Sequence, residues 1–221
     1  MLRQLAILPL LVAMHVRSQM EYRAAFWIDR IAQIITYFSS FSVIWLLVAR
    51  FNTLAGWGLE DLTLLFAFHI LGYSIGAAMS FTQMRDLEER VRLGTFDTLL
   101  TKPFSPWAYM VFSGFNLGYV GHLLLGVGLM AWALLTAHVE WSIGSAIYFI
   151  LSILSAAMVT GALLTIIGTT ALIWVRSNHL YSLYFGFWEL SRYPLNIFPG
   201  AIQAVMLTIV PLGFMAAVPV A

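Results

Sequence analysis

The stretch Met84–Pro103, MRDLEERVRLGTFDTLLTKP, holds the densest group of charges in an otherwise apolar chain. It carries eight of the 21 formally charged side chains, of which 11 are basic and 10 acidic. Met84, Leu87 and Val91 recur at helical spacing, so one side of a short helix would be apolar and the other charged. The pattern therefore predicts an amphipathic helix at the start of this stretch.

The second half of the stretch contains residues that end and begin helices. Glycine adopts the left-handed conformation without strain, so Gly94 predicts the C-terminal stop of the first helix. We expect Thr95 to cap a second, shorter helix and Pro103 to end it. Hydrophobic runs long enough to cross a bilayer flank the stretch on both sides. We therefore expect a charged helix that lies on a membrane surface and can receive a partner.

The composition indicates an integral membrane protein. Hydrophobic residues make up 61% of the chain, charged residues 10%, and the mean hydropathy is +0.88, whereas about a quarter of the residues in soluble proteins are charged. The apolar runs are too long for soluble sandwich, barrel or doubly wound folds, and they lack period-two alternation. The net charge of +1 argues against a nucleic-acid partner.

Chemistry within the chain is restricted by what the sequence lacks. There is no cysteine, which excludes disulfides and thiolate metal sites. No P-loop, GxGxxG, HExxH or EF-hand pattern is present, so the sequence indicates no nucleotide-binding or hydrolytic site. Energy for any work that this chain performs would have to come from a partner or an ion gradient.

The apolar runs predict an all-α fold, a polytopic membrane helical bundle that forms one domain over residues 1–221. Residues 1–23 are expected to form an interfacial helix that Pro9 breaks or kinks; a signal peptide is the alternative reading. We expect five spans, and their ranges are 24–48, 62–83, 107–137, 141–174 and 180–193. The fourth is long enough to be tilted or to emerge into an interface.

Four prolines interrupt the last part of the chain, at Pro194, Pro199, Pro211 and Pro219. They do not suit a straight helix, so residues 194–221 are expected to form a re-entrant helical hairpin. In the alternative, residues 179–193 are interfacial and residues 200–220 form the fifth span. Both readings leave the C-terminus of this chain on the same, exoplasmic side.

The basic residues predict the orientation. Alternating the loops places nine of the 11 on one side, with Arg50 opposite and Arg192 undecided. The N-terminus and the 84–103 stretch are therefore expected to be cytoplasmic. Small residues four apart, as in Gly72-x-x-x-Gly76, indicate close packing of helices within the bundle.

Isolated polar side chains in the spans are further candidates. Glu189 and Arg192 could line a path or pair at i, i+3, and the alternative is that both are simply hydrated at the outer interface. His69 and His122 lack neighbours at metal-binding spacing, so we expect packed histidines and no metal site. The aromatic run over residues 181–188, which includes Tyr184 and Trp188, could contact an amphipathic substrate, or it could pack the bundle or form an interfacial belt.

Three segments resemble the ABC type-2 exporter permeases, in the branch of short subunits. Glu21-Tyr22-Arg23 resembles the start of these permeases. Residues 91–103, VRLGTFDTLLTKP, resemble the segment I-x-x-G-x-[LF]-D-x-x-L-x-x-P of that branch, with Val91 in place of isoleucine. Residues 193–199, YPLNIFP, followed by Ile209-Val210-Pro211, resemble its late proline-rich stretch.

The resemblance implies a permease subunit that pairs with a second permease, identical or different, and with two cytoplasmic ATPase subunits. ATP and magnesium would bind only in the ATPase, and this chain would hold no cofactor. Residues 1–23, including Glu21, Tyr22 and Arg23, would form an elbow helix, and residues 84–103 a coupling helix. The family pattern also has a sixth span, whereas this sequence stops at Ala221; it is either truncated or lacks that span.

We therefore expect a plasma-membrane exporter subunit, not an enzyme, that moves an unidentified substrate outward. The expected ATPase-docking residues lie in the coupling helix; they are Arg85, Glu88, Glu89, Arg92, Gly94, Asp97, Lys102 and Pro103. The residues expected along the translocation path are Glu189, Arg192, Tyr184 and Trp188. The alternatives are a membrane-embedded enzyme that uses Glu189 with His69 or His122, and a non-transporting assembly subunit.

Overall fold

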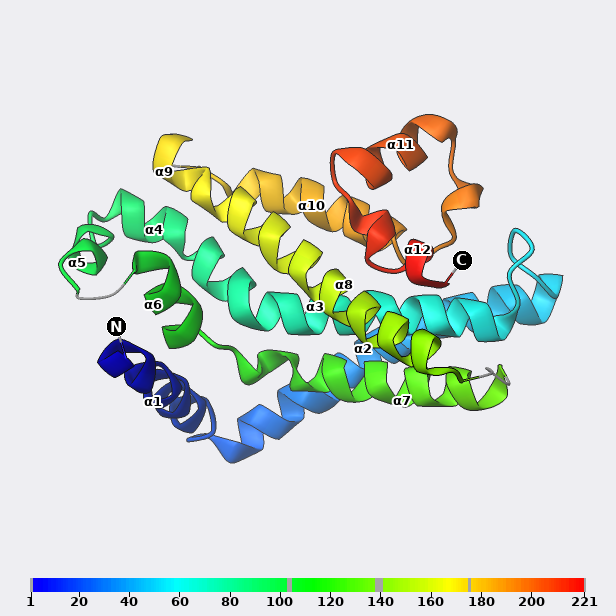
Figure 1. Ribbon diagram of the computed structural model, residues 1–221, viewed down its shortest axis with the longest axis horizontal. Helices are drawn as coiled ribbons and strands as arrows, with labels where there is room; N and C mark the ends of the chain where they lie inside the picture. Colours follow the sequence, from blue (N-terminus) through cyan, green and yellow to red (C-terminus); the bar gives the residue numbers. More distant parts are fainter. Residues whose placement is uncertain (1, 103–104, 138–140, 175, 221) are drawn as a thin grey trace.

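The computed structural model describes residues 2–102, 105–137, 141–174 and 176–220, and within these ranges every regular element is a helix (Figure 1). The α-helices are α1 Leu2–Gln19, α2 Arg23–Phe51, α3 Leu59–Arg85, α4 Leu87–Arg92, α5 Asp97–Leu100, α6 Pro106–Ser113, α7 Val120–Thr136, α8 Ile143–Thr169, α9 Ala171–Trp174, α10 Asn178–Leu190, α11 Gly200–Thr208 and α12 Ala217–Val220. Short 3-10 helices lie at Leu117–Tyr119, Leu195–Ile197 and Leu212–Phe214. The predicted all-α bundle is confirmed.

Four helical segments of the described chain are long and apolar enough to cross a membrane, or five if one bent pair is a single span. They are Arg23–Phe51, Leu59–Arg92, Leu117–Thr136 and Ile143–Trp174. Each lies within or over one of the first four predicted spans. The chain is therefore a multi-pass membrane protein, as its composition predicts.

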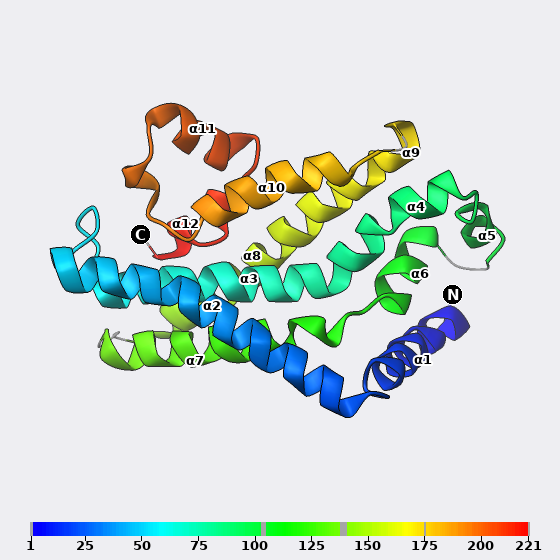
Figure 2. The ribbon, with the colours of Figure 1, turned by 180° about the vertical axis from the view of Figure 1, so that it is seen from behind.

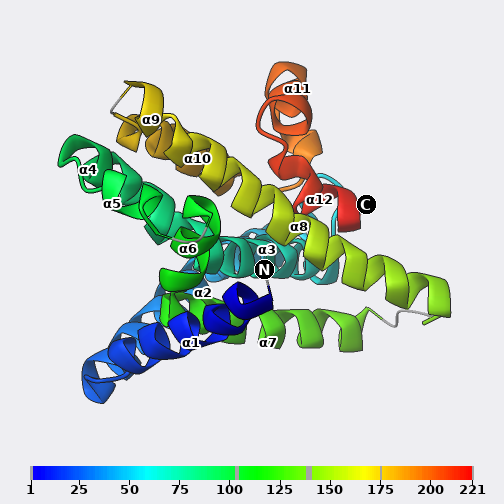
Figure 3. The ribbon, with the colours of Figure 1, turned by 60° about the vertical axis from the view of Figure 1, so that its left-hand side comes forward.

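Helix α3 is the centre of the bundle, with α2, α7, α8 and α10 arranged around it (Figures 1 and 3). Most of its residues are buried, whereas α2 buries only a few. An apolar helix that is buried on all sides needs neighbours that come close. The small residues of the predicted Gly72-x-x-x-Gly76 motif meet this need, because they face Ala156 and Ala157 of α8. The motif therefore packs helices inside one chain.

The third predicted span is not one continuous helix. Helix α6 ends at Ser113, and α7 begins only at Val120. The backbone between them is satisfied by side chains: Gln19 donates to the carbonyl of Phe115 at 2.8 Å and accepts from the N–H of Leu117 at 2.8 Å. Arg30 donates to the Leu117 carbonyl at 2.8 Å. Protein side chains take the place that water cannot take in a membrane.

Helix α1 lies beside α6, at the end of the bundle that also carries α4, α5 and α9 (Figure 2). It runs through Pro9 without a break, so of the two predicted effects of Pro9 the break is wrong. Pro9 removes one backbone hydrogen bond, and the helix continues on both sides of it. The predicted separate N-terminal helix is present, and it turns into α2 at residues 20–22.

The C-terminal part is broken at three of the four expected prolines, whereas Pro219 lies inside α12. Pro194, Pro199 and Pro211 each stand immediately before a short helix. The helical segments Gly200–Thr208 and Leu212–Val220 are bent by 78°, as a broken span or a re-entrant loop would be. The bend fits both the predicted re-entrant hairpin and the alternative of a fifth span over 200–220, which would then be a broken one. Helix α10 has 13 residues, about 20 Å, which is shorter than a bilayer core of about 30 Å.

Candidate functional site

The charged stretch forms the end of the central helix. Segment Leu59–Arg92 has 34 residues, about 51 Å at the α-helical rise, so it is much longer than a hydrocarbon core of about 30 Å. Its charged last turns, which make up α4, therefore project out of the membrane. Met84 and Leu87 are buried with Leu99, Met110 and Ala171. The predicted apolar side of α4 is confirmed, and it holds α4 against its neighbours.

Gly94 ends α4 as the sequence predicts. Its φ is +70°, in the left-handed region, and its N–H donates to the carbonyl of Val91 at 3.1 Å. The predicted cap by Thr95 is wrong, because its hydroxyl donates to the carbonyl of Arg90 at 3.3 Å instead. Phe96 occupies the N-cap position of α5 and provides no side-chain hydrogen bond.

Glu88 does not project freely from α4. Its Oε2 accepts hydrogen bonds from the backbone N–H of Ser177 at 2.6 Å and of Asn178 at 2.8 Å, and from the Ser177 hydroxyl at 3.4 Å. These bonds, the one from the Ser177 backbone foremost, hold the pKa of the Glu88 carboxyl below its ordinary value. The carboxylate joins α4 to the start of α10, and the expected place of Glu88 on a docking surface stays a prediction.

The other residues proposed for docking take different positions. Glu89 and Arg92 are about two-thirds exposed and form a loose i, i+3 pair at 3.9 Å. Among the described residues, no ion pair joins Asp86 to Arg90 or Glu88 to Arg92. Asp97 is exposed at the first turn of α5.

Two of the basic residues contact aromatic rings. The Arg85 guanidinium lies 5.8 Å from the centre of the Phe81 ring. The Lys102 ammonium lies 3.9 Å from the centre of the Tyr109 ring, which attaches it to α6. Pro103 lies outside the described residues.

Two exposed leucines at the tip of this region are not evident from the sequence. Leu93 is 61% and Leu100 59% exposed. Neither fits the spacing of Met84, Leu87 and Val91, and that departure from the apolar side is the signal that could have identified them. Large apolar side chains among charges beyond the membrane are typical of a protein contact.

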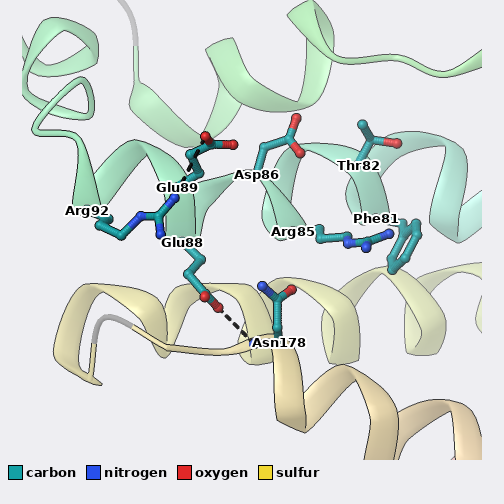
Figure 4. A pocket seen from close by; sticks show the side chains of 8 residues that line it. All are labelled: Phe81, Thr82, Arg85, Asp86, Glu88, Glu89, Arg92 and Asn178. Carbon is teal, nitrogen blue, oxygen red and sulfur yellow. Dashed lines mark hydrogen bonds and ion pairs between the residues drawn. The ribbon is translucent and has the colours of Figure 1, made fainter.

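A cavity of about 440 Å³ opens between α4 and the start of α10 (Figure 4). Arg85, Glu88 and Arg92 line one side and Asn178 the other. In Figure 4 the Glu88 side chain extends toward Asn178, whereas the Arg92 guanidinium points toward Glu89. Glu88 thus bonds to the start of α10, whereas Glu89 and Arg92 line the same cavity and pair only loosely with each other.

The predicted elbow residues lie at the turn between α1 and α2. Glu21, Tyr22 and Arg23 are all exposed, and Tyr22 is 76% exposed. The side chains that fix this corner are Gln19 and Arg30, through the bonds to the α6–α7 connection described above. No role for the three exposed residues follows from their contacts.

Helix α10 divides into a buried and an exposed side. Tyr184 and Trp188 are buried at 2% and 4% exposure, so they pack the core of the chain and do not line an open path. Beyond Asn178 and His179 at its start, the exposed side consists of Ser182, Leu183, Gly186 and Glu189. Three of these, Ser182, Gly186 and Glu189, follow one another at i, i+4 and i+7 and form a small and polar stripe.

Glu189 and Arg192 form the expected i, i+3 pair, with 2.7 Å between Oε2 and the guanidinium. They lie at the end of α10 that leads into the broken C-terminal segment. Asn196 of that segment donates to the carbonyl of Ala55 at 3.0 Å. This bond places the pair at the end of the bundle that carries the α2–α3 connection, opposite α4 (Figure 1).

Both histidines are packed in the core, as predicted. The Nδ1 of His69 lies 2.9 Å from the Ser191 hydroxyl, and its ring stacks on Trp188 at 4.3 Å between centroids. The His122 ring lies 4.3 Å from that of Tyr37. Glu189 pairs with Arg192 and His69 with Ser191, so the described contacts do not assemble the acid–base pair of the enzyme alternative.

The described residues contain no group of three or more histidine or acidic side chains that could hold a metal ion. With four long apolar helices, a charged helix at the end of the central span and a broken C-terminal segment, the chain has the architecture of a polytopic membrane helical bundle. Residues 32–221 match the family model described as ABC-2 family transporter protein. The chain belongs to the ABC-2 transporter family and is a permease component of an ABC transporter.

No curated protein and no solved structure matches the chain. Membership in the family implies partnership with an ABC ATPase, and it indicates a transport subunit rather than an enzyme. The membrane and transport character of the predicted protein is thereby confirmed, and the resemblance seen in residues 91–103 falls within the matched range.

Proposed function

We propose that this chain is the permease subunit of an exporter that is driven by ATP hydrolysis in a separate ATPase. Its ATPase-docking surface consists of Glu89, Arg92, Leu93, Asp97 and Leu100. The observation that carries the proposal is the exposure of Leu93 and Leu100, which are 61% and 59% exposed. They lie near the exposed charges of Glu89 and Arg92, which pair only loosely with each other. Apolar side chains at the centre of a contact and charges at its rim are the usual composition of a protein interface.

The docking surface faces the cytoplasm in this proposal. Most basic residues that the structure describes lie near the end of the bundle that carries α4, among them Arg17, Arg90 and Arg176. Basic residues are retained on the cytoplasmic side of membranes. The same rule puts the N-terminus inside the cell and the α2–α3 connection outside.

Transport also requires a second permease, identical to this chain or different from it. The stripe Ser182, Gly186 and Glu189 supports this, because an exposed carboxylate and hydroxyl in a membrane helix are costly against lipid. We place the stripe, in place of Tyr184 and Trp188, on the translocation path between the two permeases. The broken segment after Pro194 would close the outer end of that path. The substrate is not specified by these residues.

Substitution of the two leucines tests the docking surface. A Leu93→Asp/Leu100→Asp variant should weaken binding of the cognate ATPase by about tenfold or more, because buried anchors of an interface each contribute more than about 1 kcal/mol. The measurement is ATPase binding to the chain in lipid nanodiscs. Leu135→Asp at the end of α7 is the matched control, since Leu135 is 81% exposed but lies away from α4.

The outcome is decisive in both directions. Charge reversal of Glu89 and Arg92 together should weaken binding less than the leucine variant does, because exposed pairs contribute little. Unchanged ATPase binding in the leucine variant, with the protein still folded, would show that the docking surface is elsewhere.

A further inference from the structure

The bond between Glu88 and the start of α10 joins two segments that are about 90 residues apart in the chain. Oε2 of Glu88 accepts two backbone N–H groups, at 2.6 Å from Ser177 and 2.8 Å from Asn178 (Figure 4). Ser177 is fully buried. The carboxylate is thus directed at the backbone of a helix terminus, not at a flexible side chain.

The start of α10 depends on this carboxylate. The first N–H groups of a helix have no partner within the helix and need an acceptor. Ser177, the N-cap residue of α10, provides no side-chain cap. Glu88 supplies the acceptor from another helix, and its negative charge also suits the positive end of the helix dipole. The backbone bond from Ser177 foremost lowers the pKa of the Glu88 carboxyl, as expected for donors that favour its charged form.

Helix α10 is attached at its other end as well. Ser191, directly after α10, contacts the ring nitrogen of His69 in the middle of α3 at 2.9 Å. Between these ends, Tyr181 donates to the carbonyl of Leu164 in α8 at 3.3 Å. The helix that carries the polar stripe is therefore held by a carboxylate of α4 at one end and by the central helix at the other.

We propose that Glu88 is a positioning residue that fixes the start of α10 to α4, so that a displacement of α4 by the docked ATPase also moves α10. The inference rests on the proposed function in assigning the displacement to an ATPase. It replaces the docking role of Glu88 with one inside the chain. Leu87 and Met84 hold α4 to the bundle through apolar contacts, whereas Glu88 holds it to the helix of the path.

The bond itself is tested without any partner. In hydrogen–deuterium exchange of the chain in nanodiscs, Glu88→Ala should speed exchange in peptides covering Ser177 and Asn178 by roughly tenfold, as expected for loss of bonds to a charged acceptor. Glu88→Gln should have a smaller effect, because its amide oxygen still accepts. Glu89→Ala is the matched control, since Glu89 pairs only loosely with Arg92. Equal exchange in the Glu88→Ala and Glu89→Ala variants would overturn the proposal.

The transmission is tested in the complex. The chain contains no cysteine, so spin labels can be attached at Arg90→Cys on α4 and Leu183→Cys on α10, both exposed. With Glu88 present, the distance between the labels should stay the same in the nucleotide-free and ATP-trapped complexes. With Glu88→Ala, it should change between the two states, because α4 moves without α10; with Glu88→Gln, whose amide oxygen still accepts, it should change less.

The possible failures are distinguishable. A label distance that is as constant in the Glu88 variants as in the parent would overturn the proposed transmission. Loss of ATPase binding in Glu88→Gln, with unchanged exchange at Ser177, would return Glu88 to the docking surface and also overturn it. If the parent chain binds no ATPase at all, the proposed function fails, while the exchange experiment still decides whether Glu88 holds α10.

Discussion

Residues in the charged stretch differ in how far the local sequence determines their conformation and contacts. Gly94 needs only its own backbone, because a positive φ at a helix end is a local property. Glu88 and Glu89 are chemically identical neighbours, and yet one caps α10 while the other remains two-thirds exposed. The difference arises from the position of Ser177 in space, which no local pattern contains.

Substitution of Gly94 tests whether the turn after α4 depends on the left-handed backbone of this residue. The φ of Gly94 is +70° and a Cβ would meet no atom within 4 Å, so only backbone strain opposes a side chain. Gly94→Ala should destabilise the turn by about 1 kcal/mol, and Gly94→Asn by less. Hydrogen exchange of residues 93–96 measures this effect.

Gly128→Ala is the control for Gly94. Gly128 lies inside α7 and also has open space around its α-carbon, so alanine there should be neutral or stabilising. Exchange in the Gly94→Ala variant as slow as in the unchanged chain would show that the turn tolerates another conformation.

At the scale of elements, the contact between α3 and α8 holds the bundle together. A Cβ on Gly76 would lie 2.5 Å from the carbonyl oxygen of Ala157 and 2.9 Å from the N of Gly161. Both are backbone atoms, which cannot turn away as a flexible side chain can. The helices therefore approach as closely as they do because this position carries no side chain.

Replacing Gly76 tests this contact. Gly76→Ala should destabilise the folded chain by about 1 to 3 kcal/mol, because an overpacked contact between backbones must separate. Unfolding in a denaturing detergent measures the change. Gly144→Ala near the start of α8 should be close to neutral, since its Cβ would meet only the Ser142 hydroxyl at 3.7 Å. Equal stability of the two variants would contradict the close packing.

At the scale of the whole molecule, the ends of the bundle differ in charge and in shape. One end carries α4, α5, α6, α9 and α1, and the other the α2–α3 connection and the broken C-terminal segment (Figures 1 and 2). Orientation across a membrane follows from the basic residues alone. The fold then determines which elements share the same end of the bundle and therefore lie on the same side of the membrane.

Single cysteines test the orientation, because the parent chain has none. Thr53→Cys in the α2–α3 connection should react with a membrane-impermeant maleimide in intact cells. Thr98→Cys in α5 should react only after the cells are permeabilised. Both positions are exposed, so access is not the difference between them. The reverse pattern would invert the proposed topology and place the docking surface outside.

The sequence predicts the parts of this protein that depend on local composition. Apolar runs and their lengths define the first four spans, because transfer of apolar side chains into lipid does not depend on which neighbour they meet. Gly94 and the late prolines define breaks, because their backbone restrictions act within one or two residues. The charge pattern likewise identifies residues 84–103 as a surface segment.

Features that depend on contacts between distant helices are determined only by the tertiary structure. The helix break at residues 114–116 cannot be predicted from the local sequence. The side chains that hydrogen-bond to its backbone, Gln19 and Arg30, come from other helices. The burial of Tyr184 and Trp188 and the exposure of Leu93 follow from which side of each short helix faces a neighbour. Glu88 is the clearest case: its carboxylate acts on Ser177 and Asn178, about 90 residues away. The sequence supplied the charge, and the packing of α4 against α10 gave it a partner.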